Sequence, residues 1–100
     1  MQLVTRIREV VLKHQPNGEV ILFGSRARGD ARPDSDWDVL VLIDEKTIPK
    51  QEEQKLRDAL YELEVDTDSV ISPLIHTKAA WEARAVMPLY RVIQQEGVRA

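Results

Sequence analysis

The run of five apolar residues from Val39 to Ile43 is the feature that most constrains the fold of this chain. Side chains along a strand point alternately to opposite faces, so an unbroken apolar run is apolar on both faces. We therefore expect residues 37–43 to form a central strand of a sheet. Asp36 and Asp38 share one face of this strand, and both carboxylates lie at its beginning.

Apolar spacing and turn residues predict the other elements. The Asn-Gly pair after Pro16 favours a reversal, Pro73 suits a strand edge or end, and Thr77 suits a helix N-cap. In chain order we expect helix 3–14, strand 19–23, strand 37–43, helix 51–63, an extended segment 65–75, helix 78–85 and a last helix that Pro88 starts and Gly97 ends.

This order predicts an α+β (mixed α/β) domain with a small mixed sheet of three to four strands, covered by helices mainly on one side. The 100 residues have room for one small domain, which we expect to span residues 1–100. Hydrophobic residues make up 43% of the chain and charged residues 31%. These are ordinary values for a globular domain, so neither disorder nor a membrane class is expected.

Charge and cysteine content exclude several kinds of site. The chain has no cysteine, which rules out a disulfide framework, a thiolate zinc site and a thiol nucleophile. It shows neither a long apolar stretch nor a signal-peptide pattern, so we expect a cytoplasmic protein with no membrane partner. Residues 34–68 carry twelve acids against four Lys or Arg, which argues against a nucleic-acid partner and favours divalent cations.

A Gly-Ser pair follows the expected strand 19–23. Gly24 has no side chain, so backbone N–H groups can approach a phosphate closely at this point. Ser25 adds a hydroxyl, or caps a short helix over residues 26–29 whose positive end would face the phosphates. Taken alone, the pair is equally compatible with a strand exit followed by a helix cap.

Asp36 and Asp38 form the second part of a candidate site. Carboxylates two residues apart on a strand point the same way and can converge on a hard cation. Mg²⁺ takes oxygen ligands and commonly binds one or two carboxylates together with substrate phosphates. Such pairs also occur in acidic loops, but the position shortly after Gly24-Ser25 and before an apolar strand favours a metal site.

Phosphoryl transfer with two metal ions needs a further carboxylate as base and ligand. Asp66 and Asp68 are the candidates, and we prefer Asp68 because it adjoins the apolar run; Glu64 is a weaker third. Among the three arginines near the turn, we assign Arg26 to phosphate oxygens and leave the others unassigned. The two histidines lack a metal-ligand spacing and are expected to be structural or exposed.

The stretch from Gly24 to Asp38 reads Gly-Ser-x-Ala-Arg-Gly-x-Ala-x-x-x-Ser-Asp-x-Asp. It resembles the signature of the minimal nucleotidyltransferases (MNT) of the DNA polymerase β-like superfamily. The resemblance implies the polymerase β-like fold and transfer of a nucleoside monophosphate from an NTP to a hydroxyl. It further implies that Gly24 and Ser25 hold the triphosphate and that Asp36 and Asp38 bind Mg²⁺, with a third acid on the next strand.

Small members of this family often pair with a helical HEPN protein, and some are antitoxins that adenylylate a tyrosine of that toxin. We therefore expect a Mg²⁺-dependent nucleotidyltransferase, using ATP and two metal ions, that modifies a hydroxyl of a HEPN-type partner. Asp36, Asp38 and Asp68 would be catalytic and metal-binding. Two alternatives remain open: a non-catalytic module that binds NTP or neutralises or scaffolds a helical partner, and an aminoglycoside-type small-molecule nucleotidyltransferase acting as a homodimer.

Overall fold

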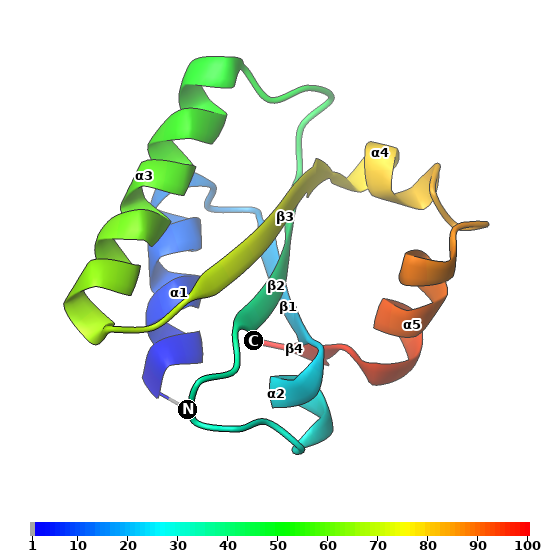
Figure 1. The fold of residues 1–100 in the computed structure, drawn as a ribbon. Coiled ribbons are helices and arrows are strands. Elements are labelled where there is room, and N and C mark those ends of the chain that lie inside the picture. The colour runs from blue at the N-terminus through cyan, green and yellow to red at the C-terminus, as the bar shows by residue number, and fades with distance from the viewer. Residues whose placement is uncertain (1) are drawn as a thin grey trace.

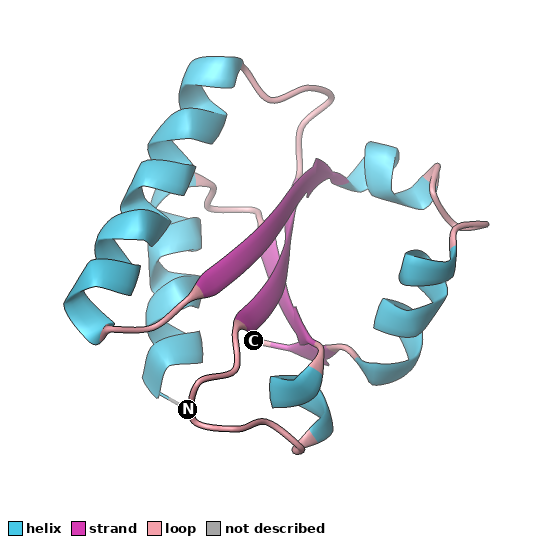
Figure 2. Cartoon of the chain, in the orientation of Figure 1, coloured by secondary structure: helices cyan, strands magenta, loops and turns pink. Residues whose placement is uncertain are grey.

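The computed structural model describes residues 2–100 as four strands and five helices (Figures 1 and 2). In chain order these are α1 (Gln2–His14), β1 (Glu19–Phe23), α2 (Ser25–Arg28), β2 (Trp37–Ile43), α3 (Lys50–Thr67), β3 (Ile71–Thr77), α4 (Lys78–Glu82), α5 (Pro88–Glu96) and β4 (Val98–Arg99). Over residues 2–100, no helix has both the length and the apolar character needed to span a bilayer.

The strands form one sheet in the order β3-β2-β1-β4. β2 is parallel to β3 and antiparallel to β1, and β1 is antiparallel to β4. The prediction of a central strand over residues 37–43 in a mixed sheet is therefore confirmed. β4 makes the fourth strand, through pairs of Ile21 with Arg99 and of Leu22 with Val98.

Helices cover both faces of the sheet, so the expectation of helices mainly on one side was wrong. α1 and α3 lie on one face, and α4 and α5 lie on the other (Figure 1). The reason is the double apolar character of β2: Val39, Val41 and Ile43 pack with α1 and α3. Leu40 and Leu42 of the opposite face pack instead with Trp81, Tyr90 and Ile93.

The segment after α3 also differs from the expectation. Residues 65–67, expected to be extended, complete α3, and β3 begins only at Ile71. The Thr67 hydroxyl donates to the carbonyl of Leu63 (2.7 Å), so this β-branched residue is accommodated in the last helical turn. Asp68 ends the helix in a left-handed conformation (φ 51°), which aspartate tolerates better than most residues.

The last third of the chain follows the prediction more closely. The Thr77 hydroxyl accepts a hydrogen bond from the Ala80 N–H (3.1 Å), as expected for an N-cap, although α4 ends at Glu82 rather than at residue 85. α5 starts at Pro88 and ends before Gly97, as expected. Its C-terminal end lies near α2 because β4 follows immediately and pairs with β1 (Figure 1).

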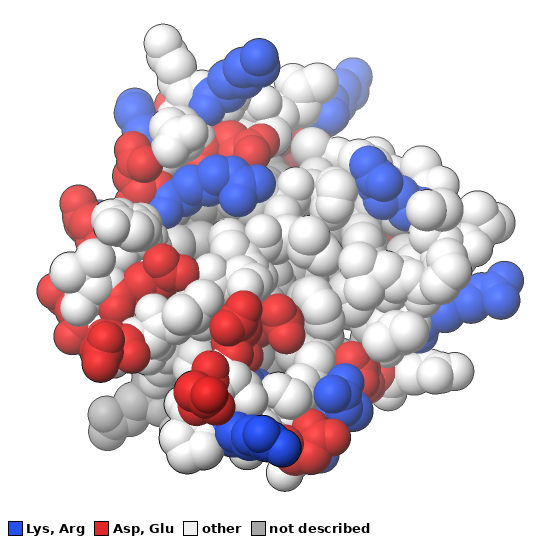
Figure 3. Space-filling view, viewed as in Figure 1, with Lys and Arg blue, Asp and Glu red and all other residues white. Residues whose placement is uncertain are grey.

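Acidic side chains gather over α3 on the face seen in Figure 3. A second group, in which acidic and basic side chains alternate, lies at the lower edge where Figure 1 shows α2. The expected acidic block of residues 34–68 is thus divided between the surface of α3 and the start of β2.

Candidate functional site

Three strand ends meet at one edge of the sheet and bring the sequence motif together. β1 ends at Phe23, which pairs with Asp38 near the start of β2. Because β3 runs parallel to β2, Ser72 near the start of β3 pairs with Asp38 from the other side. The turn, the carboxylate pair and the start of β3 are therefore neighbours.

Gly24 joins β1 to α2 in a conformation reserved for glycine, with φ 77° and ψ −159°. A β-carbon built at this position would collide with the Oδ2 carboxylate oxygen of Asp38. The Gly24 carbonyl accepts from the N–H groups of Ala27 (3.1 Å) and Arg28 (3.0 Å) and so starts the helix. Position 24 is therefore the N-cap of α2, and Ser25 is its first helical residue rather than the expected cap.

Asp36 and Asp38 lie where the sequence pattern predicts, just before and within the start of β2. The Ser72 hydroxyl donates to Oδ2 of Asp36 (3.0 Å), which orients that carboxylate from β3. Burial and the neighbouring charge of Asp36 raise the pKa of Asp38 above its ordinary value; Arg28 opposes this shift and Glu96 adds to it. The Asp38 carboxylate is thus crowded by negative charge.

Two crowded carboxylates match the donor chemistry of Mg²⁺, because a cation relieves their repulsion and phosphate oxygens can complete its coordination. Over the described part of the chain, residues 2–100, no group of three or more His, Cys, Asp or Glu side chains is arranged to hold a metal ion. Within residues 2–100, Asp36 and Asp38 therefore stand as a pair rather than as part of a metal-binding cluster of three or more such side chains.

The two candidates for the third carboxylate lie at the C-terminal end of α3 rather than on a strand. Asp66 faces α1, where Oδ2 approaches a guanidinium nitrogen of Arg6 (3.8 Å), with both side chains exposed. Asp68 lies in the turn before β3 and lines a cavity of about 170 Å³ together with Arg26 and Ser35. Of the two, Asp68 is the one that shares a cavity with residues of the Gly24 to Asp38 stretch.

Arg26 binds the loop that leads to the carboxylates. Its Nη2 atom donates to the carbonyls of Ser35 (2.9 Å) and Pro33 (3.2 Å), and its guanidinium carbon lies 4.3 Å from the centre of the Trp37 ring. The Nε atom is buried and, within residues 2–100, has no hydrogen-bond partner. Part of the donor capacity of Arg26 is therefore used to hold the loop of residues 33–35.

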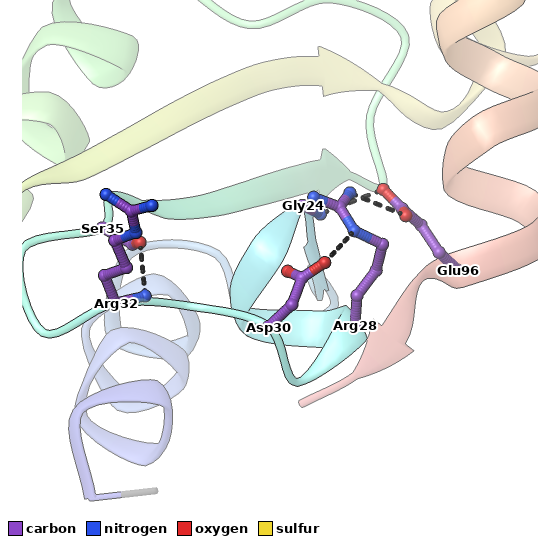
Figure 4. A network of polar contacts seen from close by, with 6 residues as sticks. All are labelled: Gly24, Arg28, Asp30, Arg32, Ser35 and Glu96. Carbon is purple, nitrogen blue, oxygen red and sulfur yellow. Dashed lines mark hydrogen bonds and ion pairs between the residues drawn. The ribbon is translucent and has the colours of Figure 1, made fainter.

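Two further residues contact the turn: Arg28, which the sequence left unassigned, and Glu96, which sequence reasoning missed. The Gly24 N–H donates to Oε1 of Glu96 (3.1 Å), and Nη1 of Arg28 donates to Oε2 of the same carboxylate (3.1 Å) (Figure 4). Arg28 Nε also donates to Asp30 (3.2 Å). Glu96 and Asp30 raise the pKa of the exposed Arg28 guanidinium, which remains positively charged.

Arg28 could have been assigned from its position in the Gly24 to Asp38 motif, whereas no sequence pattern indicates Glu96. Glu96 lies 72 residues after Gly24, and only the packing of α5 and the pairing of β4 with β1 bring it to the turn. Its side chain is 17% exposed, so the carboxylate is largely enclosed by this arrangement. Spacing along the chain contains no information about such a contact.

Two known proteins resemble this chain in sequence or fold. MJ0141 of Methanocaldococcus jannaschii (strain ATCC 43067), provisionally named a protein adenylyltransferase, is 46% identical over 59 residues, which are 59% of either chain. The match thus spans well under two thirds of that relative's length. A crystal structure of a toxin-antitoxin with AMP-PNP superposes with a TM-score of 0.67 over 95% of this chain and 69% of that one, at 20% identity. This second likeness shows a shared fold.

The sequence model of the nucleotidyltransferase domain matches residues 4–96, nearly the whole chain. The matched region contains the Gly24-Ser25 turn, the carboxylates of β2 and Glu96. The mixed sheet, with its glycine turn and carboxylate pair at adjoining strand ends, is the arrangement that the sequence motif predicts. The chain belongs to the nucleotidyltransferase domain family.

Proposed function

We propose that this protein transfers a nucleoside monophosphate, AMP from ATP, to a hydroxyl group of a partner protein. The observation that carries the proposal is the meeting of the Gly24-Ser25 turn with the Asp36 and Asp38 carboxylates. The hydrogen-bond donors of the turn suit the oxygens of a triphosphate, and the neighbouring carboxylates suit the metal ion that the triphosphate carries. The chemistry is the attack of the hydroxyl oxygen on the α-phosphorus, with loss of pyrophosphate.

The triphosphate is assigned to the turn. Gly24 offers its backbone N–H, which donates to Glu96 in this structure, Ser25 adds a hydroxyl beside it, and Arg28 supplies a charged guanidinium one helical turn later. Charge-assisted bonds from these donors suit phosphate oxygens. Arg26 was expected to contact phosphate and remains a candidate, although its bonds to the loop favour a role in positioning Asp36.

Asp36 and Asp38 are the proposed Mg²⁺ ligands, and Asp68 is a proposed third ligand of a two-ion site. The ions, when bound, would neutralise the phosphate charge and polarise the α-phosphate. In the reaction the bond from the acceptor oxygen to phosphorus forms while the bond from the α-phosphorus to the bridging oxygen breaks. Asp68 is the proposed base that takes the hydroxyl proton.

A protein acceptor fits the exposed apolar residues around the start of α5. Val86 is 79% exposed, Met87 49%, Leu89 44% and Val92 44%. A surface of this kind is typical of a protein contact. The toxin-antitoxin description of the fold neighbour and the protein adenylyltransferase name of MJ0141 support a partner protein as the acceptor. The HEPN type of this partner is proposed from the family resemblance of residues 24–38.

The test is transfer of label from [α-³²P]ATP to the co-purified partner at millimolar Mg²⁺, with Asp36→Asn and Asp44→Asn as matched variants. Both variants remove one carboxylate charge, but Asp44 is exposed in the loop that follows β2. We expect label on the partner with wild type and Asp44→Asn, and a loss of at least about 100-fold with Asp36→Asn. Absence of label with wild type and its native partner contradicts the proposal.

A non-catalytic binding module is the second candidate function. The residue of β3 paired with Asp38 is Ser72, so this position offers a hydroxyl where a third carboxylate would be expected. If partner inhibition in cells survives Asp38→Asn while transfer is absent, this second function is favoured. Loss of inhibition in the same variant favours the transferase. The aminoglycoside-type homodimer has no comparable observation in its favour.

A further inference from the structure

We propose that Glu96 is an internal anion that occupies the triphosphate position at Gly24 and that an incoming NTP must displace. The inference rests on the proposed function, because it assigns the triphosphate to the Gly24-Ser25 turn. It adds a competing group from the far end of the chain. Glu96 then sets how readily the site accepts nucleotide.

Glu96 accepts hydrogen bonds from the donors that are proposed to bind phosphate. One carboxylate oxygen accepts from the Gly24 N–H and the other from Arg28, both at 3.1 Å (Figure 4). A carboxylate that bridges a backbone N–H and a guanidinium presents two anionic oxygens to them, as a phosphate does. While these bonds exist, neither donor is directed at a ligand.

Glu96 and Asp38 also interact through their charges. Burial and Asp36 raise the pKa of Asp38 most, and Glu96 adds to this shift, so the negative charges of Glu96 and Asp38 act on each other. A triphosphate adds several negative charges to the same place, and like charges at short range in a partly enclosed site repel strongly. Binding with the Glu96 carboxylate still at Gly24 is therefore unfavourable, and its departure relieves the repulsion.

The backbone that follows Glu96 is tightly packed, whereas its side chain can rotate. A β-carbon at Gly97 would lie 2.5 Å from the Ile93 carbonyl oxygen and 2.7 Å from a methyl carbon of Ile21, so the backbone after α5 is tightly packed. The Gly97 N–H also donates to the Ile93 carbonyl (2.8 Å). The backbone at this point is held, so rotation of the Glu96 side chain is the economical way to release both donors.

The position of Glu96 argues against a role as the catalytic base. An attacking hydroxyl and the leaving pyrophosphate lie on opposite sides of the α-phosphorus in an in-line displacement. Glu96 contacts the donors assigned to the polyphosphate, on the leaving-group side. It is therefore a gating residue rather than a catalytic one.

The test is titration of MgATP into the full-length wild type, Glu96→Gln and Glu9→Gln by calorimetry. Glu9 is an exposed residue of α1, which packs on the opposite face of the sheet, and its variant makes the same change in net charge. We expect Glu96→Gln to lower the Kd for MgATP by about tenfold, since the competent fraction of the protein rises, and Glu9→Gln to leave the Kd near the wild-type value.

Glu96→Asp provides a second variant in case the amide disturbs folding. It keeps the charge but shortens the side chain, so it cannot reach both donors, and it should also bind MgATP more tightly than wild type. The amide resonance of Gly24 in ¹H–¹⁵N spectra reports the release of this donor. It should shift when MgATP is added to wild type, and it should also differ between nucleotide-free Glu96→Gln and nucleotide-free wild type.

The outcomes separate the two proposals. An unchanged or weaker affinity in Glu96→Gln, with wild type binding MgATP, overturns the gating role and leaves the transferase proposal intact. A weaker affinity would identify Glu96 as a positioning residue that supports Arg28. Failure of all variants to bind MgATP overturns the assignment of the NTP to this turn, and the gating role with it.

Discussion

The carboxylate of Asp38 fills the space that a side chain at Gly24 would need. Oδ2 of Asp38 is the atom nearest to a β-carbon built on Gly24, and Gly24 itself has a positive φ of 77°. The carboxylate proposed to bind metal and the turn proposed to bind phosphate therefore touch at one glycine.

Gly24→Ala should destabilise the fold and abolish NTP binding. The alanine methyl group would displace the Asp38 carboxylate. In addition, the backbone conformation at position 24 costs a residue with a side chain about 1–3 kcal/mol. Urea unfolding and MgATP titration measure the two effects. Gly29→Ala is the matched control, because Gly29 has φ 83° but its β-carbon would meet no atom within 4 Å. It should lose about 1 kcal/mol of stability and keep nucleotide affinity; equal affinity losses in both variants would contradict the steric account.

Asp38→Asn should abolish transfer while raising the melting temperature at neutral pH. The pKa of Asp38 is raised in the folded state, so its proton-bound form is favoured there and its ionised form costs stability above that pKa. The neutral amide removes this cost but cannot replace the carboxylate as a metal ligand. Thermal unfolding without metal and the transfer assay measure the two effects. Asp44→Asn, on an exposed residue, serves as the control, and a lower melting temperature for Asp38→Asn would contradict the prediction.

Asp68→Asn should reduce transfer by about 10²- to 10⁴-fold, the range for loss of a general base. Asp66→Asn should leave transfer unchanged, because Asp66 lies against Arg6 of α1 in an exposed ion pair of 3.8 Å, which contributes less than about 1 kcal/mol. Initial rates with saturating MgATP distinguish them. Full activity of Asp68→Asn would remove Asp68 from the proposed mechanism.

The stability of the protein should fall as the pH decreases below about 6.5. Burial and the charge of Arg84 lower the pKa of His76 from its ordinary 6.5, while Glu53 opposes the shift; the ring also stacks on Trp81 at 5.6 Å. Below 6.5 the unfolded chain binds a proton that the folded chain does not, so stability is present above this pH and is lost towards the lower folded pKa.

The measurement is the free energy of unfolding between pH 7.5 and 5.5 for wild type and two histidine variants. His76→Gln should flatten the pH dependence in this window, whereas His14→Gln should retain it. Two results would contradict the assignment to His76. One is a free energy of unfolding of wild type that changes more steeply near pH 7.5 than near pH 5.5, and the other is the same pH dependence in His76→Gln as in wild type.

The local order of the site could be predicted from sequence because its parts are close in the chain. Alternation along β2 put both carboxylates on one face, and the apolar run required a central strand. Pro88 and Thr77 marked helix starts through properties of single residues. Resemblance of residues 24–38 to a family signature added the expected fold and chemistry, and the family match over residues 4–96 confirms that the chain is a nucleotidyltransferase domain.

Other features depended on contacts that no local pattern contains. The β-branched residues at 65 and 67 looked like strand, but Thr67 bonds back to Leu63 and continues α3, so Asp68 became a helix end. Helices cover both faces of the sheet because Leu40 and Leu42 are apolar and are buried against α4 and α5, just as Val39, Val41 and Ile43 are buried against α1 and α3.

The Gly24-Ser25 turn, the Asp36 and Asp38 pair and the central strand beside them could be recognised from the amino-acid order, since backbone freedom and side-chain alternation are local properties. The distant groups that surround them follow from tertiary packing alone. Glu96 reaches Gly24 because β4 pairs with β1 at the end of α5, and Ser72 meets Asp36 because β3 is parallel to β2 in one particular register. Such contacts depend on how helices and strands pack, which the spacing of residues along the chain does not encode.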